Sequence, residues 1–240
     1  MDSKGVVVSY LSHMYPKKES SYPTKLCNHL SRRFNFQSKK EIRFLEIGSG
    51  IGTHLKIFSS ILDGEFYGVD VEPHEVKNCT VFSVNLESDS LSFDDDYFDV
   101  IFSKSVIEHV SNTKNFLSEV KRVLKPEGKV VIMTPDWQSQ MKCFYDDPTH
   151  VKPFTKQSMF SSLKMAGFKG VYVWDFMQLP STWKYPFLRV IYSTIGTLFP
   201  ESFKWKSFAG RNTNDRKFIR FSKENMILAF CKKESKNGNA

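Results

Sequence analysis

From residue 42 onward, short apolar segments alternate with segments of helical or turn-like composition. The apolar segments are rich in β-branched and aromatic residues, as in strands that are buried on both faces. Alternation of such strands with helices predicts a parallel α/β sheet. The first five expected strands are IRFLEIG (42–48), EFYGVDV (65–71), CTVFSV (79–84), FDVIFSK (98–104) and KVVIMTP (129–135).

The clearest helix is expected over residues 112–125, where apolar residues recur on one face. Asn112 or Ser111 can cap its start, and Pro126 followed by Gly128 ends it. A second helix is expected near 156–166, and residues 5–35 have the pattern of one or two helices laid over the core. The apolar face of the first helix consists of Phe116, Leu117, Val120, Val123 and Leu124.

Two late strands, GVYVWDF (170–176) and NMILAFCKK (225–233), bring the expected total to seven, with a long aromatic and basic insertion between them. At 240 residues, the chain has the length of one domain with additions. We therefore expect a single domain over 1–240. Its parts are an N-terminal helical cap (1–40), a core (41–136), a late region (137–233) that includes the insertion 179–220, and a polar tail (234–240).

The net charge of +8 conceals an asymmetry along the chain. Residues 1–40 carry eight Lys or Arg and two acids, residues 41–136 carry nine and seventeen, and residues 137–240 carry seventeen and seven. The acidic middle suits a cation, and the basic flanks suit anions such as phosphorylated substrates or lipid head groups. The same numbers of charged residues would also be found if these side chains only formed solvent-exposed faces and bound no ligand.

The four cysteines are scattered without a C-x-x-C pair, so we expect no zinc ribbon, no disulfide framework and no metal site. The early apolar stretch GVVVSYL is too short for a secretory signal, and no run of about 18 apolar residues could cross a membrane. A cytoplasmic protein fits these observations.

The segment RFLEIGSGIGTH (43–54) follows the first strand with three closely spaced glycines. A strand, a Gly-rich turn and a helix direct backbone N–H groups at a ligand above the sheet edge. A dinucleotide, S-adenosylmethionine and a plain tight turn all remain open for such a segment. Gly48, Gly50 and Gly52 form G-x-G-x-G, and Thr53 occupies the position where a dinucleotide site needs Gly or Ala, which weakens the nicotinamide alternative.

Two acidic residues narrow the choice of ligand. Asp70 ends the second strand, where a carboxylate can accept both hydroxyls of an adenosine ribose. Glu46 stands just before the glycines, and a carboxylate there disfavours a pyrophosphate but suits a sulfonium or ammonium group. The pair favours a cationic cofactor without phosphate.

These residues resemble the class I S-adenosylmethionine-dependent methyltransferases, specifically the small-molecule families with an undecorated core. The resemblance covers roughly residues 40–170. It implies a Rossmann-like, doubly wound, seven-stranded, mostly parallel sheet with an antiparallel last strand, and S-adenosyl-L-methionine as cofactor with S-adenosyl-L-homocysteine as product. The matching pieces are FLEIGSGIG, YGVDVEP, LSFDDDYFDVIFSKSVIEHV, EVKRVLKPEGKVVIMTP and DPTHVKPFTKQSM followed by MAGF.

The resemblance also implies which residues contact the cofactor. Asp70 would hold the ribose diol, and Val71 would pack on adenine. Asn85 and Leu86 would contact the adenine edge, although Asn85 departs from the acidic residue common in the family. The methionine and ribose end would be lined by Glu46, Gly48, Ser49, Gly50 and Gly52, with Ser103 and Lys104 at the end of the fourth strand and Val106 and His109 in the turn after it.

Methyl transfer from a sulfonium is an in-line displacement, so the protein mainly supplies alignment and a dry site. A hydroxyl or amine acceptor must also lose a proton, which a positioned base can take. His150 in YDDPTHVKPFT is our first candidate, with a loop-tethering hydrogen bond as the alternative; Asp146 and Asp147 are further candidates. His109 is the second catalytic candidate, although its ring could simply bond to the backbone.

The insertion 179–220 is expected to carry substrate identity. Between Pro186 and Pro200, apolar residues fall at helical spacing, and aromatic and basic residues flank them. An interfacial membrane helix has this pattern, and so does a lid helix that covers the core. The first interpretation predicts peripheral membrane contact through residues 183–206; both admit a greasy or anionic acceptor.

The sequence therefore favours a methyltransferase that acts on the oxygen of a small, sugar-like or lipid-like or lipid-linked acceptor. One alternative is a methyltransferase-like subunit that binds the cofactor or a partner without catalysis. An RNA methyltransferase is less favoured, because the chain shows no appended RNA-binding module and has TPDW where amino-methylating enzymes carry Asn-Pro-Pro-aromatic.

Overall fold

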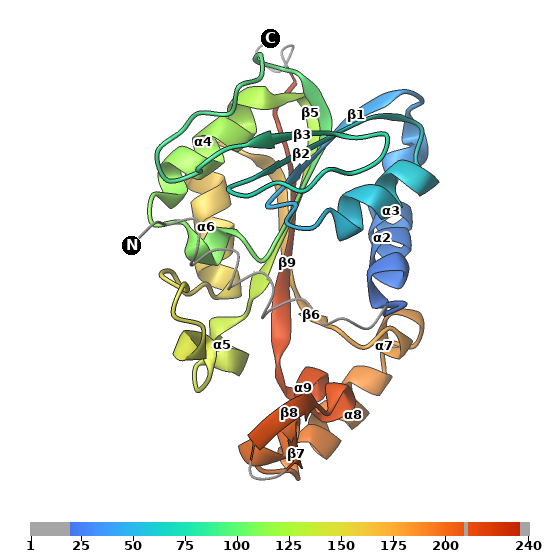
Figure 1. The fold of residues 1–240 in the computed structure, drawn as a ribbon, viewed down its shortest axis with the longest axis vertical. Helices are drawn as coiled ribbons and strands as arrows, with labels where there is room; N and C mark the ends of the chain where they lie inside the picture. The colour runs from blue at the N-terminus through green and yellow to red at the C-terminus, as the bar shows by residue number, and fades with distance from the viewer. Residues whose placement is uncertain (1–19, 209–210, 236–240) are drawn as a thin grey trace.

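The computed structural model describes residues 20–208 and 211–235, and its centre is a seven-stranded sheet (Figure 1). The strand order is β3-β2-β1-β4-β5-β9-β6. Neighbouring strands from β3 to β5 run parallel, and β9 runs antiparallel to both β5 and β6. The strands are β1 (Ile42–Ile47), β2 (Gly64–Asp70), β3 (Thr80–Ser83), β4 (Phe98–Lys104), β5 (Leu124–Pro135), β6 (Lys169–Met177) and β9 (Asn225–Lys232).

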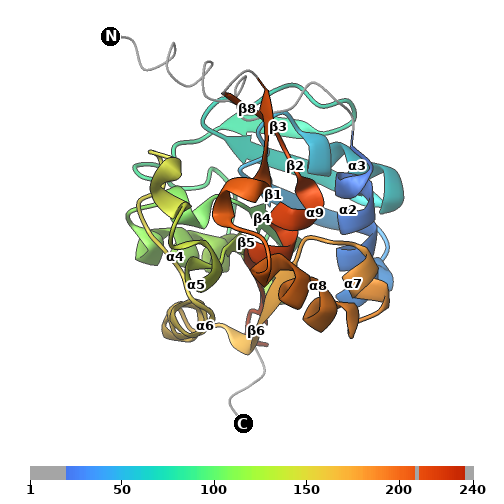
Figure 2. The ribbon, with the colours of Figure 1, turned by 90° about the horizontal axis from the view of Figure 1, so that it is seen from below.

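Helices cover both faces of the sheet. Figure 2 shows α4 and α6 on one side and α2 and α3 on the other. The α-helices are α2 (Tyr22–Arg33), α3 (Thr53–Ile61), α4 (Thr113–Val123), α5 (Trp137–Gln140), α6 (Lys156–Met165), α7 (Ser181–Lys184), α8 (Leu188–Thr197) and α9 (Lys217–Lys223). Short 3₁₀ turns are η1 (Phe36–Ser38), η2 (Ile107–His109), η3 (Phe144–Asp146) and η4 (Glu201–Lys204).

Successive residues of the central strands pack into two different cores. Phe44 and Phe102 belong to the core beneath α2 and α3, whereas Leu45 and Ile101 belong to the core beneath α4 and α6. This alternation follows from the two-residue period of a strand. Burial of each such side chain contributes about 1.5 to 3 kcal/mol, so both faces of the sheet hold the fold together.

The expected sheet, with seven strands and an antiparallel last strand, is confirmed. Both clear helices are present, but the first ends at Val123 rather than 125 because Leu124 already pairs with Phe98 in the sheet. Leu124 is buried, which fits the apolar face of a helix as well as a strand. Of the expected N-terminal cap, the structure shows α2, and residues 1–19 lie outside the described part.

The insertion after β6 lies beyond the carboxyl ends of β5 and β6 (Figure 1). It contains α7, α8, η4 and a two-stranded sheet of β7 (Trp205–Phe208) and β8 (Arg211–Asp215). Val190 and Leu198 of the α8 region are 71% and 77% exposed. The apolar positions expected to share one face of this helix are divided: Leu188, Tyr192, Ile195 and Phe199 are half-buried, and Ile191 and Leu198 are exposed. The lid helix and the interfacial helix therefore both stay predictions. In residues 20–208 and 211–235, we find no helix with the length and apolarity needed to cross a membrane.

Candidate active site

The glycine turn joins β1 to α3 at the carboxyl edge of the sheet. Gly48, Gly50 and Gly52 have φ values of 75°, 49° and 74°, a region that favours glycine. A Cβ on Gly48 would overlap the side chain of Val106, which stands in the turn after β4. The three glycines thus let the chain turn sharply and bring bare backbone to the edge where parallel sheets bind ligands.

Asp70 is fixed beside this turn at the end of β2. Its Oδ2 accepts a hydrogen bond from the backbone N–H of Gly50 at 2.8 Å, and its Oδ1 accepts one from Glu72 at 3.2 Å. Val71 follows with a side chain that is 52% exposed. The edge therefore presents an oriented carboxylate next to an uncovered apolar surface.

Asn85 and Leu86 come to the same edge after β3, where the N–H of Val84 donates to the carbonyl of Asp70 at 2.9 Å. The side chain of Asn85 is exposed and accepts a hydrogen bond from the N–H of Glu87. Leu86 is partly buried against the core beneath α4 and α6. The structure thus brings both residues near Asp70, and part of the Leu86 side chain packs against the core.

Glu46 is buried on the α2 and α3 side of β1, with 1% of its surface exposed. Its Oε1 lies 3.3 Å from Nδ1 of His54, and no described residue bonds to Oε2. Burial raises the pKa of Glu46, while His54 acts in the opposite direction. His54 was not predicted as a site residue, because a histidine in the first turn of a helix has no distinguishing sequence pattern.

Ser103 and Lys104 end β4 beside Glu46. Ser103 is buried, and its hydroxyl has no partner within the described part of the chain. Burial lowers the pKa of Lys104, whereas the carboxyl groups of Glu108 and Glu46 raise it. Lys104 therefore interacts electrostatically with two buried acids near the carboxyl ends of β1 and β4.

Glu108 and His109 belong to η2, directly after β4. Glu108 is fully buried; its Oε2 accepts a hydrogen bond from the hydroxyl of Thr134 at 2.9 Å, while Oε1 has no hydrogen-bond partner among residues 20–208 and 211–235. Burial raises the pKa of Glu108 to about 7. His109 was expected from the sequence and Glu108 was not, although the acid adjoins His109 shortly after a strand.

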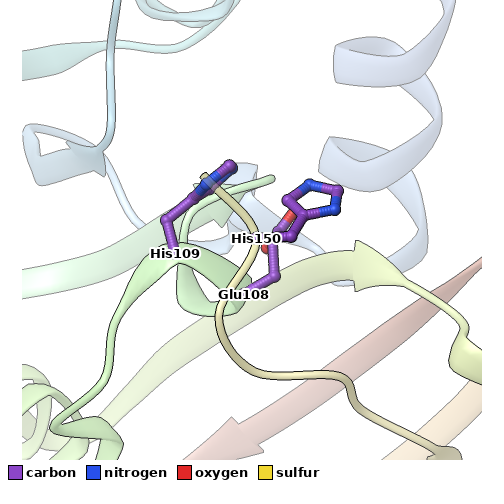
Figure 3. A group of neighbouring side chains, drawn as sticks. All are labelled: Glu108, His109 and His150. Carbon is purple, nitrogen blue, oxygen red and sulfur yellow. The ribbon is translucent and has the colours of Figure 1, made fainter. Parts of the chain in front are cut away.

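The loop that carries His150 is anchored over η2. The N–H groups of Val151 and Lys152 both donate to the carbonyl of Glu108, at 3.0 and 2.9 Å. The rings of His109 and His150 are 4.8 Å apart between centroids. Figure 3 shows Glu108 and His109 on η2 and His150 on the loop that crosses it, three side chains that gather at one place.

Hydrogen bonds set the orientation of both imidazole rings. Nδ1 of His109 lies 3.1 Å from the carbonyl oxygen of Thr149 and 2.9 Å from its hydroxyl. Nδ1 of His150 lies 2.6 Å from the carbonyl oxygen of Phe144. A carbonyl only accepts, so each Nδ1 carries the proton and each Nε2 keeps its lone pair. Burial also lowers the pKa of His109, which favours a neutral ring.

The two acids that precede the histidine differ in position. Asp147 accepts hydrogen bonds from the N–H and hydroxyl of Thr149 at 3.0 and 2.6 Å, and its Oδ2 lies 3.8 Å from Nε2 of His150. Asp146 is exposed in η3. Asp147 therefore belongs to the edge of the histidine cluster.

Comparison with known proteins matches residues 45–132 to a family model described as a methyltransferase domain. Phosphoethanolamine N-methyltransferase 2 of Caenorhabditis elegans is 30% identical over 98 residues, which are 37% of this chain and 22% of that protein. The 2-methyl-6-phytyl-1,4-hydroquinone methyltransferase of a Synechocystis strain is 30% identical over 105 residues, 40% of this chain and 32% of that protein. The chain thus spans less than a third of either relative.

Among solved structures, a SAM-dependent methyltransferase from Archaeoglobus fulgidus superposes with a TM-score of 0.59 and 20% identity, covering 97% of this chain and all of that one (100%). This likeness concerns the fold, and it extends beyond the segment matched by the family model. The chain thus has the seven-stranded α/β fold of S-adenosylmethionine-dependent methyltransferases, and residues 45–132 match the model of a methyltransferase domain.

Proposed function

We propose that this chain transfers a methyl group from S-adenosylmethionine to an oxygen of a small, sugar-like or lipid-like acceptor. One observation carries the proposal: the glycine turn with its fixed Asp70 adjoins β1, and Glu108 and His109, joined by His150, follow β4, the parallel neighbour of β1 at the same sheet edge. A site for the donor thus adjoins groups that can take a proton from the acceptor. The match of residues 45–132 to a methyltransferase domain supports the same chemistry.

The residues at the glycine turn fit the cofactor. Glycine is required at positions 48 and 52, because a Cβ there would overlap Val106 or Val76, and the exposed Val71 offers an apolar surface for adenine. The carboxylate of Asp70, oriented by the N–H of Gly50, supports a role in binding the ribose hydroxyls. The buried Oε2 of Glu46, which has no hydrogen-bond partner among the described residues, suits the cationic end of the molecule. We propose that the cofactor is held by Glu46, Gly48, Ser49, Gly50, Gly52, Asp70, Val71, Asn85 and Leu86, with Ser103 and Lys104 beneath it.

When bound, the cofactor supplies an activated methyl group, so the chain contributes alignment and proton removal. Nε2 of His150 and Nε2 of His109 hold the lone pairs, and the backbone carbonyls fix the ring orientations. We propose these two histidines as the groups that receive the acceptor proton, with Glu108 packed beside them. A hydroxyl acceptor agrees with this arrangement better than an acceptor that is already a strong nucleophile. Removal of its proton by a base increases the reactivity of a hydroxyl the most.

The nature of the acceptor is supported by the relatives and by α8. The two curated relatives are named for phosphoethanolamine and for a phytyl hydroquinone, one polar and one lipid-like. The apolar side chains that α8 exposes beyond the sheet edge favour the lipid-like or lipid-linked acceptor, and with it peripheral membrane contact.

Cofactor binding is tested by calorimetric titration with S-adenosylhomocysteine. Asp70→Asn removes a charged hydrogen-bond acceptor, and such bonds contribute about 1.5 to 3 kcal/mol, so we expect at least a roughly tenfold weaker affinity. The matched control is Asp94→Asn, which changes an exposed acid away from the turn. Failure of the wild-type chain to bind the ligand would refute the proposed donor.

Transfer is tested with S-adenosylmethionine labelled at the methyl group and fractions of a cell extract. We expect label in a small-molecule or lipid fraction and none in RNA. His150→Ala should retain affinity for S-adenosylhomocysteine and lose most transfer. A chain that binds the cofactor but labels no fraction would instead support the non-catalytic subunit.

Membrane contact is tested by co-sedimentation with anionic vesicles at low salt. Val190→Asp and Leu198→Asp should reduce vesicle binding, because each places a charge on the apolar surface of α8. Met165→Asp, at an 87% exposed position on α6, is the control for adding a charge to an exposed apolar site. Equal vesicle binding by all four proteins, or none by the wild type, would contradict the membrane contact.

A further inference from the structure

Glu108, His109 and His150 each offer a ligand atom, and these atoms lie within 4.8 Å of one another (Figure 3). Two imidazoles and one carboxylate are a donor set that proteins use for Zn²⁺ and for other divalent transition metals. The three side chains come from two segments, η2 and the crossing loop, which backbone hydrogen bonds hold together. The cluster is therefore an anchored arrangement and not a chance meeting of mobile surface groups.

The orientation of the two histidines is that of metal ligands. In metal sites, the ring nitrogen that does not bind the ion usually donates to a carbonyl or carboxylate, which fixes the tautomer. Here Nδ1 of His109 faces the carbonyl of Thr149, and Nδ1 of His150 faces the carbonyl of Phe144. Both Nε2 atoms are consequently left as electron-pair donors.

Glu108 supplies an independent indication. Its Oε1 is buried and makes no hydrogen bond to any residue that the structure describes, although a buried polar atom without a partner is costly. Lys104 attracts Glu108 through space without a hydrogen bond to it. A cation beside the two histidines would give Oε1 its missing partner, while Thr134 continues to hold Oε2.

We propose that Glu108, His109 and His150 bind one divalent transition-metal ion of the Zn²⁺ type. Ligands about 2.1 Å from a tetrahedral ion lie about 3.4 Å from one another, so ligand atoms up to 4.8 Å apart must close in by up to about 1.4 Å. Asp147, 3.8 Å from Nε2 of His150, adds negative charge at the rim. This assignment differs from the expectation of no metal, which rested on the cysteines alone.

Three protein ligands leave a position open on the ion, as in catalytic metal sites. We assign this open position to the acceptor oxygen, a step that rests on the proposed methyl transfer. With both Nε2 atoms bound to the ion, water takes the acceptor proton in place of the histidine bases proposed above. Binding to the ion would lower the pKa of the acceptor hydroxyl, and the resulting alkoxide or phenolate would attack the methyl carbon and displace S-adenosylhomocysteine. The acceptor class is thus an alcohol or phenol that can ligate a metal.

The experiment measures metal binding directly. The full chain is stripped with a chelator, then titrated with Zn²⁺ alone, with metal content determined by elemental analysis, and with Co²⁺, whose absorption reports coordination. We expect one equivalent of metal in the wild type. Glu108→Gln and His150→Ala should each weaken Zn²⁺ binding by at least about tenfold, in line with what even outer-shell losses cost. His74→Ala, at an exposed histidine outside the cluster, is the matched control.

Glu108→Gln preserves the shape of the side chain, so a loss of metal binding with an unchanged urea unfolding curve separates ligation from folding. Absence of wild-type binding, or binding that both cluster variants retain, would overturn the proposal. The same samples are titrated with S-adenosylhomocysteine. Zn²⁺ binding without S-adenosylhomocysteine binding would refute the donor and leave the metal site standing, and the reverse result would refute the metal site alone.

Discussion

At the scale of single residues, the candidate site concentrates groups that are costly to bury. Glu46 and Glu108 are both fully or almost fully buried, and each has one carboxylate oxygen that no residue of the described chain satisfies. Burial raises the pKa of both acids. A buried carboxyl group without a partner destabilises a fold more than an apolar residue at the same position would. Two such groups at one sheet edge therefore indicate that they bind a ligand.

Substitution of Gly48 tests how closely the glycine turn packs against its neighbours. Gly48→Ala places a Cβ in a left-handed conformation, at about 1 to 2 kcal/mol, and drives it into Val106, at about 1 to 3 kcal/mol more. Gly170→Ala is a matched control, because Gly170 also has a positive φ but open space around it. Urea unfolding should show the larger loss for Gly48→Ala; equal losses would contradict the close contact with Val106.

Asp99 predicts a pH dependence of stability. Burial alone would raise the pKa of Asp99, but the N–H of Arg43 and the ammonium groups of Lys125 and Lys39 hold it below its usual value. The charged form therefore stabilises the fold above the unfolded-state pKa, and this contribution is lost as the pH falls through the folded-state pKa.

Asp99→Asn should consequently lower the free energy of unfolding by about 1.5 to 3 kcal/mol at neutral pH, the range for hydrogen bonds to charged groups. The difference from the wild type should shrink as the pH is lowered, because the wild-type carboxylate becomes neutral too. Urea titrations over a pH series measure both. A difference that grows toward acid pH would contradict the assigned ion pairs.

At the scale of elements, periodicity and turn residues predict the strands and the main helices. Leu124 marks a limit of this prediction. A buried leucine fits the helix pattern and the strand pattern equally, and its pairing with Phe98 in the sheet decides between them. The glycine turn was predictable for the same local reason. The meeting of Glu108 with His150 was not, because it depends on backbone bonds between segments 40 residues apart in the chain, which no local pattern encodes.

Thr155 begins α6, the helix that follows the loop of His150. Its hydroxyl accepts a hydrogen bond from the N–H of Ser158, whose hydroxyl in turn accepts one from the N–H of Thr155. Thr155→Ala removes one half of this capping box and should cost about 1 kcal/mol of stability, whereas Thr155→Ser should cost little. Urea unfolding of the three proteins decides; indistinguishable curves for Ala and Ser would show that the cap contributes nothing.

At the scale of the whole molecule, one sheet carries two cores. The core beneath α2 and α3 and the core beneath α4 and α6 share the backbone of β1, β4, β5 and β9. Neither layer can lose its packing without exposing a face of the same strands. This architecture gives the site a firm edge from which η2, the glycine turn and the histidine loop project, and the single domain over 1–240 stays a prediction.

The shared sheet predicts a single unfolding transition. Phe58→Leu, beneath α3, and Leu163→Val, beneath α6, change opposite cores, and each should lower stability by about 1 kcal/mol. Both should shift one common transition, seen alike by far-UV circular dichroism and tryptophan fluorescence, with an unchanged denaturant slope. Met165→Ala, at the exposed end of α6, should shift it by less than about 0.5 kcal/mol. If either core variant separated the two probes into distinct transitions, the cores would be independent units, and the sheet would not be what couples them.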